Sequence, residues 1–286
     1  MILVADSGSS KTDWMGYTPE GPIAFSTQGI NPYFLNAQEI LKLISKKKEI
    51  AGYAEQVKEI YFYGAGCSSP DKHEVISNGL SAFFPNAFIS VDNDLIGSAY
   101  ATCGDDKGLT CILGTGSNIS YYDGHTVHNG RHGLGYVLGD EGSGTWFGKK
   151  LITSYLYKTM PSDLQLAFAK EFEVNKETII TNVYQKPFPN TYLASFSRFM
   201  SGHKEHPYIL QLLTEGFQEF INSNIKDYPE HAGLHCHFVG SIAYHFRDVL
   251  TATCLKNGIN LGKILQKPIE GIYQYVLKKE GVAVSS

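Results

Sequence analysis

The stretch MILVADSGSSKTD, residues 1–13, decides the fold. Residues 1–5 form a short apolar run of the kind that makes a buried β-strand. This strand runs into a turn, from Asp6 to Thr12, that combines a carboxylate, a glycine, hydroxyl groups and a lysine. Backbone N–H groups in such turns bind anions, so the segment predicts a phosphate-binding turn at the end of a strand.

A second copy of this strand-turn-strand pattern follows later in the chain. The first copy reads ILVADSGSSKTDWMGYTPEGPIAFS (residues 2–26), and the second reads LTCILGTGSNISYYDGHTVHNG (residues 109–130). Gly8-Ser9 aligns with Gly116-Ser117, and a third strand-to-Gly-Ser junction occurs at 237–241. Ordinary hairpin turns are the alternative explanation. Two copies at equivalent places and a third junction favour two lobes that hold a polyphosphate between them.

Composition narrows the classes of partner. The chain has 286 residues, enough for two domains, with 43% hydrophobic and 18% charged residues. Its net charge is −4 and its pI is near 6.2, which gives no electrostatic case for binding nucleic acid. Acidic substrates would therefore need local positive charge or a metal.

Cysteine usage and hydropathy point to a cytoplasmic protein. The five cysteines are scattered and show no Cys-x-x-Cys spacing, which argues against structural disulfides and against a four-thiolate cluster. No apolar stretch approaches the roughly 20 residues that a membrane span needs. Met1 leads directly into the first strand, so we expect no cleaved leader.

The first half of the chain predicts the order βββαβαβα. Helix and strand signals follow the first three strands: a capping box at 36–39, a strand at 59–63, a helix that starts at Ser69-Pro70, and a strand at 87–91 that leads through Asp92-Asn93-Asp94 into a helix of small residues. The second half repeats the three strands. It then predicts helices from 143 to 227, a strand from 234 to 239, a helix from 242, a strand around 264 and a last helix from 268 to 279.

Taken together, these segments resemble a known superfamily. The segments that carry the likeness are D6SGSSKTDW, G29INP, V91DNDLIGSA, C111ILGTGSN, G133LGYVLGDEGSG, H237FVGSIA and P268IEG. They are similar to the actin, hexokinase and Hsp70 superfamily of ATP-binding folds and, within it, to the BadF/BadG/BcrA/BcrD-type ATPase family and its N-acetylglucosamine kinases.

The resemblance implies an α/β fold of two actin-like (ribonuclease H-like) lobes, each a βββαβαβα unit with a mixed sheet, and an ATP cleft between them. We expect the first lobe at 1–105, with the C-terminal helix 268–286 packing back on it. The second lobe, at 106–267, would carry a helical insertion.

The resemblance also implies the residues that bind ATP and Mg²⁺. Asp6 would meet Mg²⁺, through water, because Mg²⁺ keeps several of its waters. The remaining ATP-binding residues would be Gly8, Ser9, Ser10, Lys11, Thr12, Gly114, Thr115, Gly116, Ser117, Gly216, Gly240, Ser241 and His245. Ser7 and Ser9 stand where the family usually has glycines, and Ser10 stands where it more often has threonine.

Asp94 matches the family's catalytic aspartate, which accepts a proton from the sugar hydroxyl. Its predicted place at a helix N-terminus favours an ionised carboxylate. An N-cap role for Asp94 is the structural alternative, and Asp92 is a second candidate that spacing does not exclude.

For the sugar, the resemblance implies Asn31, Asp94, Gly133, Leu134, Gly135 and Asp140. A glycine-rich loop that lets backbones approach is the alternative reading of 133–144, and Asp140 and Glu141 can also act as charges at a helix N-terminus. Leu134 stands where other kinases of the family carry tryptophan, which changes the shape of a sugar pocket.

The sequence therefore predicts an ATP-dependent kinase that phosphorylates the 6-hydroxyl of N-acetylglucosamine or a close amino sugar. The first alternative is an ATPase that activates a partner redox enzyme of the 2-hydroxyacyl-CoA dehydratase or benzoyl-CoA reductase type. A non-enzymatic amino-sugar sensor is the second. Assembly as a homodimer is left open. The spacing of His125, His128 and His132 suits zinc, but no cysteine pair accompanies these histidines, and zinc is not expected.

Overall fold

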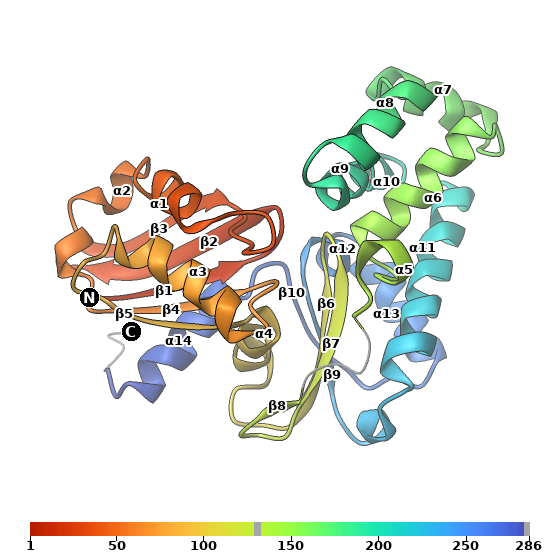
Figure 1. Ribbon diagram of the computed structural model, residues 1–286. Helices are drawn as coiled ribbons and strands as arrows, with labels where there is room; N and C mark the ends of the chain where they lie inside the picture. Colours follow the sequence, from red (N-terminus) through yellow and green to blue (C-terminus); the bar gives the residue numbers. More distant parts are fainter. Residues whose placement is uncertain (129–132, 283–286) are drawn as a thin grey trace. The chain divides into compact units, whose positions relative to one another are not determined.

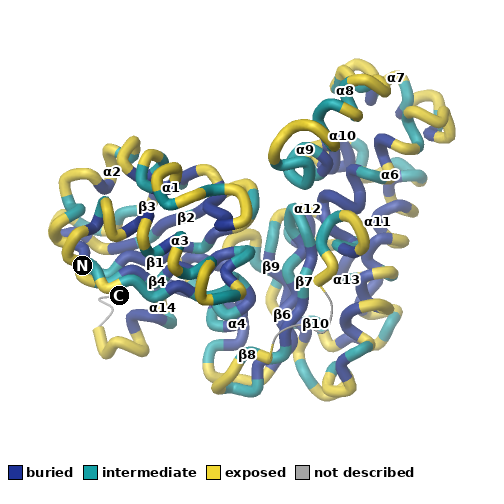
Figure 2. The backbone as a smooth tube through the Cα atoms, in the orientation of Figure 1, coloured by how far each residue is buried: buried dark blue, intermediate teal, exposed yellow. Residues whose placement is uncertain are grey.

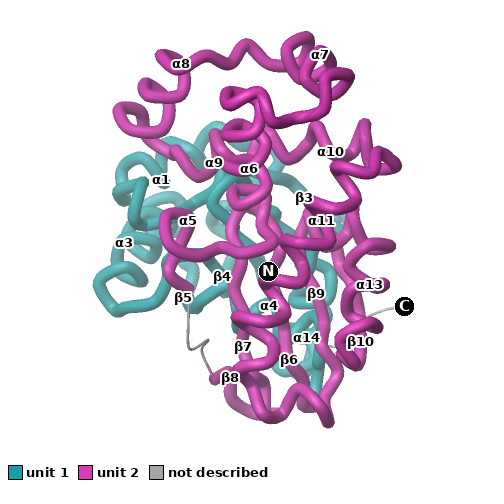
Figure 3. The backbone as a smooth tube through the Cα atoms, turned by 90° about the vertical axis from the view of Figure 1, so that its right-hand side faces the viewer, with its two compact units in different colours: residues 1–105, 267–286 teal, residues 106–266 magenta. Residues whose placement is uncertain are grey.

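The computed structural model describes residues 1–128 and 133–282. The chain divides into two compact units, which Figure 3 colours separately: residues 1–105 with 267–286, and residues 106–266. The first unit is therefore discontinuous in sequence, since its last helix follows the whole of the second unit.

The first unit is built on a five-stranded mixed sheet in the order β3-β2-β1-β4-β5. Its strands are β1 (Ile2–Ser7), β2 (Lys11–Thr18), β3 (Gly21–Gln28), β4 (Glu59–Gly64) and β5 (Phe88–Asn93). β2 pairs antiparallel with β1 and β3, while β4 pairs parallel with β1 and β5. Leu3, Val4 and Ala5 are fully buried because helices cover both faces of the central strand β1.

Helices lie on both faces of this sheet (Figure 1). They are α1 (Ala37–Ile44), α2 (Lys48–Ala51), α3 (Pro70–Ser81), α4 (Asp94–Cys103) and α14 (Ile269–Lys279), with a 3₁₀ turn at Ala54–Gln56. α1 and α3 share one apolar core with Trp14 and Phe62. On the other face α14 packs against α4, where a methyl group added to Gly97 would lie 3.0 Å from the Ile272 side chain.

Two predicted helix starts can be compared with the structure. The capping box of α1 is confirmed, since the Asn36 side chain accepts from the Glu39 N–H and the Glu39 side chain accepts from the Asn36 N–H. Ser69 precedes α3 as predicted, but its hydroxyl donates to the Asp71 carboxylate instead of capping the helix backbone.

The second unit is built on another five-stranded mixed sheet, in the order β10-β9-β6-β7-β8. Its strands are β6 (Gly108–Leu113), β7 (Ser117–Tyr122), β8 (Val127–His128), β9 (Cys236–Val239) and β10 (Leu261–Leu265). β9 begins at Cys236, two residues after its predicted start, and a 3₁₀ turn at Pro229–Ala232 precedes it. Alternate residues of β6, Leu109, Cys111 and Leu113, enter the core of this unit.

The second unit is richer in helices than the first. The helices are α5 (Gly135–Leu138), α6 (Gly144–Leu156), α7 (Ser162–Glu171), α8 (Lys176–Ile180), α9 (Pro189–Ser195), α10 (Arg198–Gly202), α11 (Pro207–Phe220), α12 (Ser241–His245) and α13 (Arg247–Lys256), with π-helical turns at Thr181–Gln185 and Ile221–Ile225. The single helix predicted from Ile242 is divided into α12 and α13, because Phe246 leaves the helical conformation and is buried in the core.

These observations confirm the predicted α/β class with two mixed sheets. In both units the central strands are the most deeply buried part of the chain (Figure 2). No helix in the described parts of the chain is long and apolar enough to cross a membrane.

Candidate functional site

Three carboxylates gather at one end of the sheet in the first unit. Asp6, near the end of β1, lies directly opposite Asp13 on β2, so their side chains share one face of the sheet. Asp94 is the first residue of α4, which follows β5. The pKa of Asp6 is raised to about 8, mainly by burial and in addition by the nearby charges of Asp94 and Asp13. The first turn of the chain thus ends at a cluster of like charges.

Asp94 itself has a raised pKa of about 6, because burial outweighs the backbone N–H groups that lower it. Asn93, not Asp94, is the N-cap, since its side-chain oxygen accepts from the Leu95 N–H at 2.9 Å. The N-cap alternative for Asp94 is therefore wrong. Asp92 faces a different set of groups, because His73 and Lys279 offset the burial that raises its pKa.

Ser7 and Thr12 face the interior and not the surface of the turn. Both are fully buried, and their hydroxyl oxygens lie 2.6 Å apart. The Ser7 hydroxyl also donates to the Ile30 carbonyl, while the Ile30 N–H lies 3.1 Å from the Ser7 oxygen and 3.0 Å from the Thr12 oxygen. Ser7 therefore joins the turn to the segment that precedes Asn31.

The Gly29-to-Asn31 segment lies against the first turn. A side chain at Gly29 would bring its first carbon to 2.4 Å from the Gly8 carbonyl oxygen and to 2.5 Å from the Ser9 backbone, so only glycine fits. Asn31 is 6% exposed, and its side-chain oxygen accepts from the Tyr33 N–H. The structure thus brings the segment of the predicted sugar residue Asn31 into direct contact with the predicted phosphate turn.

The remaining residues of the first turn are more accessible. Gly8 and Ser10 are exposed, Ser9 is partly exposed, and the Gly8 N–H donates to the Lys11 carbonyl. The Lys11 ammonium lies 2.7 Å from Asp13 Oδ1, and the ammonium of Lys267 lies 3.4 Å from the same oxygen. Lys11 therefore lies beside the carboxylate cluster in an ion pair.

The second turn, Gly114 to Ser117, is held by the N-terminus of α6. The N–H groups of Gly144 and Thr145 donate to the carbonyls of Gly114 and Thr115, and the Thr145 hydroxyl donates to the Thr115 carbonyl as well. Ser143 caps the helix, with its side chain accepting from the Trp146 N–H. Backbone contacts thus fix this turn.

Asp140 reaches the second turn from the glycine-rich loop. Its Oδ1 accepts from the Ser117 N–H at 3.1 Å, and a methyl group added to Gly116 would lie 2.8 Å from its Oδ2. Its backbone has φ of 61°, a left-handed conformation that Asp adopts more readily than most residues. Burial raises the pKa of Asp140, whereas the Ser117 N–H and the Lys149 charge lower it. The structure therefore joins a predicted sugar residue to a predicted phosphate turn in this unit also.

The third junction lies beside the second turn. Gly240 has φ of 119°, and a side chain there would come within 2.4 Å of the Leu113 carbonyl oxygen. Ser241 and His245 on α12 are exposed. Gly216 is packed against aromatic side chains, because its nearest neighbours are the rings of Phe147 and Trp146. Gly240 and Ser241 are thus brought to the second turn, while Gly216 lies within the contact of α11 with α6.

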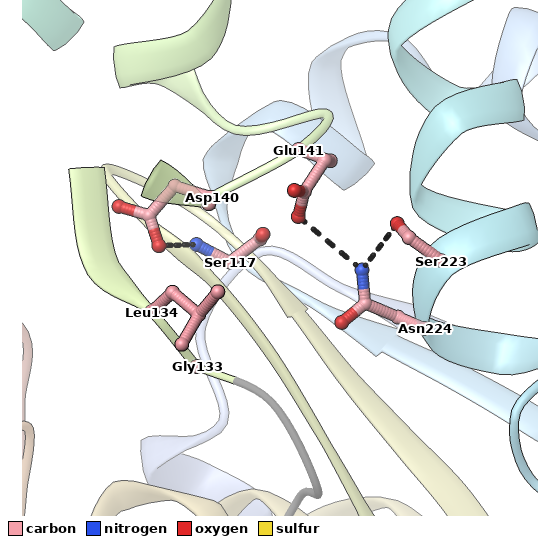
Figure 4. Close-up of a pocket in the computed structure, with 8 residues that line it drawn as sticks. Ser117, Gly133, Leu134, Asp140, Glu141, Ser223 and Asn224 are labelled. Atoms are coloured by element: carbon pink, nitrogen blue, oxygen red, sulfur yellow. Dashed lines mark hydrogen bonds between the residues drawn. The ribbon is translucent and has the colours of Figure 1, made fainter. Parts of the chain in front are cut away.

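A cavity of about 140 Å³ opens in the second unit next to Asp140 (Figure 4). The backbone of Gly133, Leu134 and Gly139 forms part of its wall, and the polar side chains that line it belong to Ser117, Asp140, Glu141, Ser223 and Asn224. Leu134 is 65% exposed, and the short helix α5 that follows Leu134 carries the exposed Val137 and Leu138.

Sequence reasoning missed three residues of these surroundings. Asn224 lines the cavity from the π-helical turn after α11, and Glu141 hydrogen-bonds to it. Lys267 joins the Lys11 and Asp13 pair from the start of the returning chain segment. Glu141 could have been found through its neighbour Asp140, but nothing local in the sequence marks Asn224 or Lys267. Of the three histidines considered for zinc, His128 is paired with Asp123, and His132 lies outside the described residues.

The fold relates this chain to proteins of known structure. The two five-stranded mixed sheets define a protein of the actin-like fold class to which two-domain sugar kinases belong. The chain is 40% identical to the putative N-acetylglucosamine kinase of Porphyromonas gingivalis, over 98% of this chain and 100% of that one, with a TM-score of 0.90. The chain therefore belongs to the same family as that protein.

More distant structures share the fold. The putative N-acetylglucosamine kinase of Chromobacterium violaceum is 15% identical over 96% of this chain and 98% of that one, with a TM-score of 0.60. A ROK family glucokinase from Streptomyces griseus, solved with glucose and AMPPNP, is 14% identical over 96% and 98%, with a TM-score of 0.56. No protein-family model and no curated protein matches the chain.

Proposed function

We propose that this protein is an ATP-dependent kinase that transfers the γ-phosphoryl group to the 6-hydroxyl of N-acetylglucosamine or a close amino sugar, and that its family is the BadF/BadG/BcrA/BcrD type. The observation that carries the proposal is the pairing of Asp94 with Asp6 at the end of the first sheet. Membership in the family of the Porphyromonas gingivalis protein supports it.

Asp94 is the proposed catalytic residue. A general base works best when its pKa lies near the working pH, and burial brings the Asp94 carboxyl to about 6. At neutral pH this carboxylate is ionised and able to accept a hydrogen bond from a sugar hydroxyl. Phosphoryl transfer needs little more from a base than orientation of the hydroxyl and acceptance of its proton.

Asp6 is the proposed contact of Mg²⁺, through water. The pKa of Asp6 is about 8 in a cluster with Asp94 and Asp13. The surroundings of Asp6 in the folded protein therefore do little to offset the negative charge of its ionised carboxylate. Carboxylate oxygens are the donors that Mg²⁺ accepts in proteins, so the residues present fit this ion. Bound there with ATP, Mg²⁺ would neutralise charge on the phosphates.

The two turns are the proposed phosphate-binding elements. In the first, Gly8, Ser9, Ser10 and Lys11 supply backbone N–H groups, hydroxyls and an ammonium group. Thr12 contributes by shaping the turn, because its hydroxyl is buried against Ser7 and Ile30. In the second unit the ATP-binding residues proposed are Gly114, Thr115, Gly116, Ser117, Gly240, Ser241 and, less directly, Gly216 and His245.

For the sugar, we propose Asn31, Asp94, the backbone of Gly133 to Gly135, and Asp140. Asn31 and Asp140 are the side chains that link each sugar segment to its turn, through Gly29 in the first case and Ser117 in the second. Recognition of the sugar and placement of the phosphates would thereby depend on the same local structure.

The structure does not favour an activator of a redox partner. That activity requires thiolate ligands for a bridging cluster. Cys67 and Cys103 are 1% and 6% exposed. Burial raises the pKa of Cys67 to about 12, with the charges of Asp94 and Asp92 adding to the effect. A buried thiol of this kind does not ionise at neutral pH.

A coupled ADP-release assay with a panel of hexoses and amino sugars tests the proposal. We expect N-acetylglucosamine to raise turnover well above the sugar-free rate, and mass spectrometry of the product to show one added phosphoryl group at C6. A turnover that no sugar stimulates would overturn the kinase assignment and favour a sensor.

A further inference from the structure

The polar side chains that line the cavity beside Asp140 include two carboxylates, which accept hydrogen bonds. Asp140 and Glu141 contribute carboxylates, and none of the described residues that line the cavity carries a positive charge. The nearest described counter-charge is Lys149, whose half-buried ammonium donates to the Tyr136 carbonyl at 2.5 Å. The N–H and O–H groups of a ligand in this cavity can therefore donate hydrogen bonds to these carboxylates.

Asn224 fixes the direction of one of these acceptors. Its side-chain nitrogen donates to the Ser223 hydroxyl at 3.0 Å and to a Glu141 carboxylate oxygen at 3.4 Å (Figure 4). Because both bonds use the nitrogen, the amide group is held in one orientation. The residue is only 5% exposed and lines the cavity, so its amide is a nearly buried polar group in the cavity wall.

The backbone that carries Asn224 is also unusual. Helix α11 ends at Phe220 and continues into the π-helical turn Ile221–Ile225, in which Asn224 lies. Such turns inside helices are uncommon and occur often at functional sites, because they reorient the side chains that follow. This observation is independent of the cavity and points to the same residue.

We infer that this cavity is the specificity subsite of the proposed sugar site, and that Glu141 and Asn224 are its specificity-determining residues. It accepts a substituent that donates hydrogen bonds, such as an acetamido or ammonium group, and it rejects an anionic substituent such as a lactyl ether. This inference rests on the proposed function and narrows its substrate class to amino sugars without a negative charge.

Size and charge both support this assignment. A cavity of about 140 Å³ holds a substituent of several heavy atoms, and Leu134 supplies apolar surface for an acyl methyl group. A carboxylate placed beside Asp140 and Glu141 would meet two like charges, and repulsion of this kind is an effective way to exclude a competing ligand. An amide N–H or an ammonium group would instead pair with the Asn224 oxygen and the Glu141 carboxylate.

The experiment compares three sugars with the wild-type protein and three variants. Calorimetry with each sugar alone gives Kd, and the ADP assay gives kcat and KM for N-acetylglucosamine, glucosamine and N-acetylmuramic acid. The variants are Asn224→Asp, Glu141→Gln and, as matched control, Asn222→Asp. Asn222 lies on the same turn, is exposed, and bonds to Gln218 and Lys226 outside the cavity.

We expect wild-type kcat/KM for N-acetylmuramic acid to be about 100-fold or more below that for N-acetylglucosamine. Asn224→Asp should raise Kd and KM for N-acetylglucosamine about tenfold, with a smaller rise for glucosamine, because a third carboxylate suits a cation better than an amide. Glu141→Gln should reduce the discrimination against N-acetylmuramic acid by about tenfold. The control should leave all three sugars unchanged.

Equal wild-type kcat/KM for the anionic and neutral sugars would overturn the inference, as would an unchanged sugar ranking in both cavity variants. If Asn224→Asp does not fold, the wild-type panel and Glu141→Gln still decide. ADP release with every sugar alike refutes the inference and leaves the proposed function intact. Selective binding of neutral sugars without any ADP release refutes the proposed function and leaves the inference intact.

Discussion

The first and second turns have similar sequences but are held by different parts of the protein. The first turn is anchored by side chains, because the buried hydroxyls of Ser7 and Thr12 bond to Ile30. The second is anchored by backbone, because its carbonyls accept from the first N–H groups of α6. Repetition of a strand-turn-strand pattern therefore does not preserve the contacts that support the turn.

The two turns also differ in charge. Asp6, Asp13 and Asp94 surround the first, with Lys11 in an ion pair among them. A single carboxylate, Asp140, lies on the second and bonds directly to its backbone at Ser117. The first turn therefore lies in a cluster of ionisable side chains, whereas the second is bonded directly to a carboxylate.

The largest effect is expected from Asp94→Asn. This change keeps the size of the side chain but removes the group that accepts the proton, so kcat should fall by about 10² to 10⁴. Steady-state kinetics measures this loss of kcat. Calorimetry measures the affinity for ATP and for sugar, which we expect to be unchanged. Asp92→Asn is the matched control. A larger loss of kcat in that variant would show that Asp92, and not Asp94, is the base.

Gly29→Ala tests whether the first turn depends on its close contact with the sugar segment. The new methyl group would overlap the Gly8 and Ser9 backbone at 2.4 to 2.5 Å, so we expect a loss of about 1–3 kcal/mol in the free energy of unfolding. Urea denaturation measures this loss. Gly202→Ala, where no atom lies within 4 Å, is the control. Equal stability of the two variants would show that the turn adjusts freely.

Ser7→Gly tests whether the buried serine is structural. The hydroxyl bonds to Thr12 and Ile30 would be lost inside the protein, so unfolding should become easier by about 1–3 kcal/mol while kcat changes little. Ser9→Gly, at a partly exposed position, should have a smaller effect. A fall in kcat without loss of stability would instead give Ser7 a direct part in the reaction.

The smallest effect is a pH dependence of stability in the absence of nucleotide and metal. The pKa of Asp6 is raised from 3.8 to about 8, so its favourable contribution is complete below pH 4 and is lost as the pH rises to about 8. Asp6→Asn removes this loss. The variant should exceed the wild type in Tm by about 2 °C or more at pH 8, and by less at pH 5.

Scanning calorimetry across this range measures the difference. Asp71→Asn is a suitable control, because Asp71 is exposed and its hydrogen bond from Ser69 lowers its pKa. Its contribution therefore does not change between pH 5 and 8. Parallel melting curves for the wild type and Asp6→Asn would show that Asp6 is already ionised at neutral pH.

Local patterns predicted most of the fold. The alternation of β2, the glycine-rich turns and the Asn36 capping box depend on neighbouring residues, so the sequence contains the relevant information. The exact bounds of β9 and the break at Phe246 depend on packing within the core, which no local pattern reveals.

The candidate site was predictable in part for the same reason. Asp6 lies near the end of a strand and Asp94 directly follows one, and such positions are recognisable. Whether Ser7 and Thr12 face inward depends on the register of β1 with β2 and on the distant segment at Ile30. Asn224 enters the cavity from a turn that is far from Asp140 in sequence, and a single asparagine near a helix end gives no signal of its own.

The discontinuity of the first unit has a consequence for the synthesis of the protein. Helix α4, which begins with Asp94, packs closely against α14, where Ala101 lies within 2.9 Å of a methyl group added to Gly271. The ribosome makes α14 after every other described element, so a growing chain exposes the apolar side of α4 until α14 has been made. Asp94, the proposed catalytic residue, therefore belongs to a helix whose packing partner is made after every other described element. Until then the apolar side of α4 is a surface to which chaperones can bind.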